Sequence, residues 1–114
     1  MSTLNFERCN LFLVEDNRYV RTVLDNLLRY LSFKNITVAE NGADAIDYFK
    51  SHGTAGGISG HHAIDLVISD LVMSPINGLL LLRWLRTAKE SPNRFMPFIM
   101  LSGAADNEYV HAAR

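Results

Sequence analysis

Acidic and hydroxyl side chains follow three short apolar segments of the sequence, and their chemistry suits a metal ion and a phosphoryl group. These residues are the pair Glu15–Asp16, then Asp70, then Ser102. Short apolar runs bounded by polar residues are typical of strands buried on both faces of a parallel sheet. In such sheets, ligands bind beyond the carboxyl ends of the strands. If the three strands are neighbours, three carboxylates and one hydroxyl meet in one pocket, which favours a hard divalent cation.

A carboxylate in such a pocket can act as a nucleophile. It attacks a phosphoryl group and becomes an acyl phosphate. Because nucleophile and donor are both anionic, a cation such as Mg²⁺ is needed to neutralise their repulsion and align the oxygens. Without the cation, two unit charges about 4 Å apart repel by roughly 4 kcal/mol at an effective dielectric near 20. We therefore expect raised, coupled pKa values for Glu15, Asp16 and Asp70 in the metal-free protein.

An alternation of strand and helix patterns must position these residues. Strands are predicted at 11–14, 36–39, 65–69 and 98–101, and helices at 43–51, 79–89 and from 106 to 114. A further helix follows the first strand, where apolar residues recur at three- and four-residue steps (Val20, Val23, Leu24, Leu27, Leu28 and Leu31). We expect this stripe to face a sheet. Four strand–helix units in succession predict a three-layer α/β fold, a parallel sheet with helices on both faces.

The helix over 79–89 leaves one question open. A buried stripe of Leu79, Leu82 and Leu85 would place Leu80 and Trp84 off that face. These two side chains then belong either to the periphery of the core or to an exposed apolar patch that binds a partner.

Bulk properties narrow the classes of protein. The 114 residues suit a single domain. A formal net charge of −1 with scattered basic residues provides no basic stripe for nucleic acid. The single cysteine, Cys9, permits no internal disulfide, and no apolar stretch is long enough to cross a bilayer. A cytoplasmic protein that binds neither nucleic acid nor membrane is the simple expectation.

Three segments and their spacing give the chain a family resemblance. They are Leu-Val-Glu-Asp-Asn at 13–17, Asp-Leu-Val-Met at 70–73 with Pro75 and Gly78 after it, and Leu-Ser-Gly-Ala at 101–104. Together they resemble the receiver domain of two-component response regulators, the family that includes the chemotaxis response regulator. The resemblance implies a flavodoxin-like sheet with strand order 2-1-3-4-5.

The resemblance also implies a role for each site residue. Asp70 would be the phosphoacceptor, and Ser102 would contact the phosphoryl group. Asp16 would bind Mg²⁺ directly, Glu15 would hold it through water, and the backbone carbonyl of Val72 would be a further ligand.

The sequence departs from the family pattern in two places. Ser74 stands where the proline is usual, so that proline falls at Pro75. The family's fifth strand, which bears a lysine, and its fifth helix have no counterpart, since only twelve residues follow Ser102 and none is lysine. Residues 1–114 are therefore expected to be a C-terminally truncated receiver domain.

Two functions remain open at this stage. In the first, a histidine kinase or histidine phosphotransfer protein phosphorylates Asp70, and an unknown downstream protein reads the change. In the second, the chain is a degenerate receiver that acts as a phosphorylation-independent interaction module. We expect no enzyme beyond self-catalysed phosphorylation and dephosphorylation. A P-loop nucleotidase would need the phosphate loop G-x-x-x-x-G-K-[ST], which is absent, and an aspartyl-phosphate hydrolase would need a second acid where Val72 stands. If the short form is stable, a dimer or strand-exchanged oligomer is a further expectation.

Overall fold

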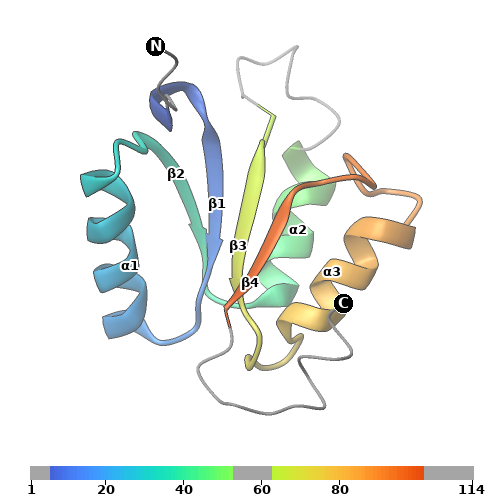
Figure 1. The fold of residues 1–114 in the computed structure, drawn as a ribbon. Coiled ribbons are helices and arrows are strands. Elements are labelled where there is room, and N and C mark those ends of the chain that lie inside the picture. The colour runs from blue at the N-terminus through green and yellow to red at the C-terminus, as the bar shows by residue number, and fades with distance from the viewer. Residues whose placement is uncertain (1–5, 53–62, 102–114) are drawn as a thin grey trace.

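Strands and helices alternate along the chain in the structure, a computed structural model that describes residues 6–52 and 63–101 (Figure 1). The elements are η1 (Phe6–Arg8), β1 (Asn10–Val14), α1 (Arg18–Tyr30), β2 (Asn35–Ala39), α2 (Gly42–His52), β3 (Leu66–Asp70), α3 (Gly78–Thr87) and β4 (Phe98–Leu101). The four predicted strands and the helices around 20–31, 43–51 and 79–89 are confirmed, with ends shifted by one or two residues. The helix predicted at 106–114 lies outside the described residues.

The four described strands form one parallel sheet in the order β2-β1-β3-β4. At their carboxyl ends, Val14 of β1 pairs with Ala39 of β2 on one side and with Ser69 of β3 on the other. Glu15 follows directly after β1, and Asp70 is the last residue of β3. This order confirms the flavodoxin-like arrangement and brings the two acidic tips side by side.

Helices cover both faces of the sheet. The central strand β1 sends alternate apolar side chains to opposite faces, so both faces carry apolar surface that must be covered. Leu11 and Leu13 belong to a buried cluster on the α1 side, together with Leu28 of that helix. Phe12 and Val14 belong to the cluster on the other face, where α2 and α3 pack (Figure 1). Side chains from Leu11 to Val14 have no exposed surface, as expected of a strand buried on both faces.

The apolar stripe of α1 faces the sheet only in part, so that prediction was wrong for four of its six residues. Leu28 is buried and Leu24 packs against the same cluster. The others are between 39% and 51% exposed, namely Val20, Val23, Leu27 and Leu31. The polar flank of the helix lies over the β2 edge, where Arg21, Thr22, Asp25 and Arg29 line a shallow pocket with Ile36 and Val38. The apolar stripe is thus wider than the contact that one helix makes with a sheet.

The predicted inward face of α3 was confirmed for Leu85 and wrong for Leu79 and Leu82. Gly78, Leu81 and Leu85 are the buried positions, whereas Leu79 and Leu82 are only half-buried. Trp84 packs against the core, with its ring centroid 6.3 Å from that of Phe49, so it belongs to the core periphery. Leu80 is 47% exposed. Among the described helices, none is long and apolar enough to span a membrane.

Candidate functional site

Three carboxylates converge at the carboxyl ends of β1 and β3. One oxygen from each of Glu15, Asp16 and Asp70 lies within 4.8 Å of the other two. Glu15 is buried, Asp70 is half-buried and Asp16 is exposed, so the cluster opens to solvent on one side. The structure thus brings together three of the predicted site residues. Ser102 follows Leu101, which pairs with Asp70, but lies outside the described residues.

The backbone and side chain of Glu15 are both held in place. Its N–H donates to the carbonyl of Ala39 at 3.1 Å, which ties the turn after β1 to the end of β2. Its carboxylate accepts from the N–H of Asn17 at 3.0 Å. Its backbone carbonyl accepts from Nη1 of Arg21 at 2.9 Å. These contacts fix the position of the Glu15 carboxylate beside Asp70.

Burial and neighbouring charges alter the acidity of the cluster. Burial raises the pKa of Glu15, and the charges of Asp70 and Asp16 raise it further, against the N–H of Asn17. Burial also raises the pKa of Asp70, and the charge of Asp16 adds to the effect. The predicted rise is thus confirmed for Glu15 and Asp70. A nearby cation would remove this penalty, because it favours the ionised carboxylates.

Asp70 is oriented by the turn that follows β3. One of its carboxylate oxygens accepts from the N–H of Leu71 at 2.8 Å. The N–H of Gly78 donates to the carbonyl of Leu71 at 2.9 Å, which closes the loop between β3 and α3. In that loop the Ser74–Pro75 peptide bond is cis. Val72, two residues beyond Asp70, is 62% exposed.

Two glycines allow the loop to pack tightly against the starts of α2 and α3. A β-carbon at Gly42 would lie 2.5 Å from the carbonyl oxygen of Ile76, and the Gly42 N–H donates to that oxygen at 3.1 Å. A β-carbon at Gly78 would collide with the carbonyl oxygen of Asp70. Gly78 belongs to the family motif, whereas no sequence signal had pointed to Gly42 or to Arg21.

The donor set fits Mg²⁺. It consists of oxygen atoms only, and Mg²⁺ binds carboxylates and carbonyls in this way while it keeps several waters. The buried carboxylate supplies a fixed ligand position, and the exposed one leaves an entry path. The raised pKa values of Glu15 and Asp70 indicate that ionisation of these two carboxyl groups is costly without a counter-ion.

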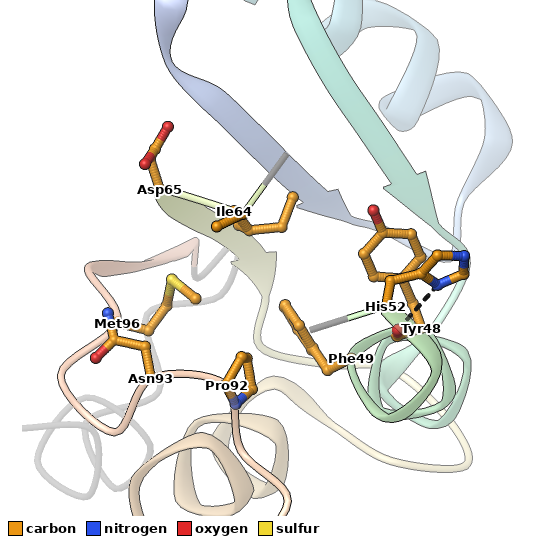
Figure 2. Close-up of a pocket in the computed structure, with 9 residues that line it drawn as sticks. Tyr48, Phe49, His52, Ile64, Asp65, Pro92, Asn93 and Met96 are labelled. Atoms are coloured by element: carbon orange, nitrogen blue, oxygen red, sulfur yellow. Dashed lines mark hydrogen bonds between the residues drawn. The ribbon is translucent and has the colours of Figure 1, made fainter. Parts of the chain in front are cut away.

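A second pocket lies at the opposite end of β3 and takes no part in this cluster. It has a volume of about 340 Å³ and lies between the end of α2, the start of β3 and the segment before β4 (Figure 2). Its walls include Tyr48, Phe49 and Met96. The rings of Tyr48 and His52 are stacked at 4.4 Å. No residue of the acidic cluster lines it.

The strand order and the two helical layers define a class, the doubly wound α/β domains, here with an acidic cluster at the carboxyl ends of the strands. Residues 11–114 match the response regulator receiver domain family. The chain therefore belongs to the receiver domains of two-component signalling, as the sequence motifs had predicted.

This chain matches different shares of the length of its relatives. The alkaline phosphatase synthesis transcriptional regulatory protein SphR of Synechococcus elongatus is 33% identical over 98 residues, which are 86% of this chain and 35% of the relative. The chemotaxis protein CheY-3 of Vibrio cholerae is 26% identical over 110 residues, 96% of this chain and 75% of the relative. The chain thus spans about a third of the first relative and three quarters of the second.

Solved structures show the same fold. A response regulator receiver protein from Pseudomonas putida has a TM-score of 0.70 at 26% identity, over 92% of this chain and 76% of that one. The receiver domain of the histidine kinase CKI1 from Arabidopsis thaliana, complexed with Mg²⁺ and BeF₃⁻, has a TM-score of 0.80. It covers 94% of this chain and 74% of that one, and at 20% identity it shows the fold alone.

Proposed function

We propose that this receiver domain is a phosphorylation-dependent switch whose phosphoacceptor is Asp70. The donor is a histidine kinase or a histidine phosphotransfer protein, and a downstream protein reads the phosphorylated state. The observation that carries the proposal is the approach of three carboxylates within 4.8 Å, with Glu15 buried. Repulsion among them destabilises the folded protein unless a divalent cation is bound, and aspartyl phosphorylation requires such a cation.

Each residue of the cluster has a role in the proposed reaction. An oxygen of Asp70 forms a bond to phosphorus as the bond between phosphorus and the donor histidine nitrogen breaks, so one phosphoryl group is transferred. The N–H of Leu71 orients the Asp70 carboxylate for this attack. Asp16, Asp70 and the carbonyl of Val72 would hold Mg²⁺ directly, and Glu15 would hold it through water. Mg²⁺ held there would supply the positive charge that offsets the repulsion between nucleophile and donor.

The proposed sensing group is the hydroxyl of Ser102. The residue before it, Leu101, pairs with Asp70 in the sheet. A serine hydroxyl can donate one hydrogen bond to a phosphoryl oxygen. Such a bond would pull the segment after β4 toward the site, a local change that can alter a binding surface.

Three further assignments accompany this function. We assign no turnover of other substrates, a cytoplasmic location, and residues 1–114 to a single receiver domain. We also propose that the chain can associate as a dimer or a strand-exchanged oligomer, and the half-exposed apolar flank of α1 offers surface for a dimer. Light scattering that shows a monomer at all concentrations would contradict the association.

The proposal is tested by intact mass after incubation with Mg²⁺ and acetyl phosphate. A single phosphoryl adduct is expected, and it should require Mg²⁺ and disappear in Asp70→Asn. Asp47→Asn is the matched control, because Asp47 is exposed on α2 and remote from the strand tips. Absence of an adduct in wild-type protein would instead favour the phosphorylation-independent interaction module.

A further inference from the structure

We propose that Arg21 is a positioning residue for the metal site. Its guanidinium holds the turn that carries Glu15 and Asp16, so that loss of Arg21 weakens divalent-cation binding even though a positive charge is removed. The inference rests on the proposed Mg²⁺ site and adds to it a residue that touches neither metal nor phosphoryl group.

The contact is specific to the peptide that joins the two acidic residues. Nη1 of Arg21 donates to the Glu15 carbonyl at 2.9 Å, and this carbonyl belongs to the Glu15–Asp16 peptide. Because the peptide unit is planar, a fixed carbonyl also fixes the direction in which the chain leaves toward Asp16. The Glu15 carboxylate is separately held by the N–H of Asn17. Arg21 thus completes the support of the turn between β1 and α1.

The arginine itself is well anchored. It lies in the first turn of α1, where its N–H donates to the carbonyl of Asn17 at 2.8 Å. Its side chain is only 17% exposed, whereas its ionic partner Glu40 is 71% exposed and 4.0 Å away. An exposed ion pair at that distance contributes little. The hydrogen bond to the Glu15 carbonyl is therefore the contact that matters for the site.

The sign of the effect separates positioning from simple electrostatics. A guanidinium close to a cation site repels the cation, so removal of its charge alone would tighten metal binding. Groups that orient the ligands of a metal act in the opposite direction, and their loss typically weakens affinity by about 10- to 100-fold. A weaker affinity after loss of Arg21 is thus explained by lost orientation and not by lost charge.

Arg18 offers a matched control on the same helix. It is exposed, begins α1 close to Asp16, and carries the same charge as Arg21. Arg18→Met removes a cation near the site without removing the hydrogen bond to Glu15. Its expected affinity for a divalent cation is equal to that of the wild type or higher.

The test uses Mn²⁺ as the probe, with free Mn²⁺ measured by electron paramagnetic resonance during titration of the 114-residue chain. Arg21→Met keeps the packing of the aliphatic stem but has no donor, and its dissociation constant is expected to rise about tenfold. Arg21→Lys keeps one donor and should lose less. Urea unfolding without metal identifies the folded variants that enter the comparison.

Wild-type affinity or tighter binding of Mn²⁺ in a folded Arg21→Met protein would overturn the inference. The loss of charge alone would then explain the measured affinity. A weakened affinity in both Arg21→Met and Arg18→Met would also overturn it, since the effect would not be specific to the Glu15 carbonyl. Wild-type protein that binds no Mn²⁺ would overturn the proposed metal site itself, which is a distinct result.

Discussion

Gly78 lies directly against the backbone of Asp70. A β-carbon at Gly78 would collide with the carbonyl oxygen of Asp70 and lie 2.7 Å from the sulfur of Met100. The start of α3 is thus pressed against the strand end that carries the proposed phosphoacceptor. This contact links the rotation of α3 to the geometry of the site.

Replacement of Gly78 by alanine should therefore disturb both stability and phosphorylation. Overpacking of this kind costs about 1–3 kcal/mol in the free energy of unfolding. The displaced backbone would also move Asp70, so the rate of adduct formation with acetyl phosphate should fall. Urea unfolding and intact mass measure the two effects.

Gly42→Ala is the matched comparison for this variant. It creates a similar collision, but with Ile76 in the loop and not with Asp70. A comparable loss of stability with a smaller loss of phosphorylation is expected. Equal phosphorylation rates in both glycine variants and the wild type would contradict the link between Gly78 and the site.

Ionisation of the acidic cluster should make the metal-free protein less stable as pH rises. The pKa values of Glu15 and Asp70 are raised in the folded state, mainly by burial. Their contribution to stability is fully present below the ordinary carboxyl pKa near 4 and is lost as pH rises through the raised values. Urea midpoints measured without metal from pH 4 to 7 should thus fall less in Asp70→Asn than in the wild type. Parallel pH profiles would count against a repulsive cluster.

Mg²⁺ should restore this lost stability. At a concentration 100 times its dissociation constant, a ligand that binds only the folded state stabilises it by about 2.7 kcal/mol. Thermal unfolding with and without Mg²⁺ should show this gain in wild-type protein and little of it in Asp16→Asn. Asp44→Asn, an exposed carboxyl change in the first turn of α2, should retain the gain.

The two flanks of the α1 stripe should respond differently to truncation. Leu28 is 7% exposed and Leu27 is 51% exposed. Leu28→Ala is expected to cost about 2–5 kcal/mol in unfolding free energy, because it leaves a cavity under the helix. Leu27→Ala should cost no more than about 1 kcal/mol. Equal losses in urea unfolding would mean that Leu27 is covered in solution.

The sequence by itself determined the strands, the helices and the acidic residues at the strand tips. These features are local, since a short apolar run between polar residues and a three- to four-residue apolar period each depend on one segment of the chain. The motif around Asp70 was sufficient to predict the family. The convergence of Glu15, Asp16 and Asp70 followed because parallel strands end at the same edge.

Only the tertiary structure decided how far each helix rotates and what holds the site together. Leu81 and Leu85 are buried and Leu82 is only half-buried, in a helix whose first residue, Gly78, lies against the backbone of Asp70. The hydrogen bond from Arg21 to the Glu15 carbonyl depends on the path of the turn after β1. No pattern of residues in the sequence predicts that path. Periodicity shows that a helix has an apolar face, but close contacts between backbones decide which of its residues are buried.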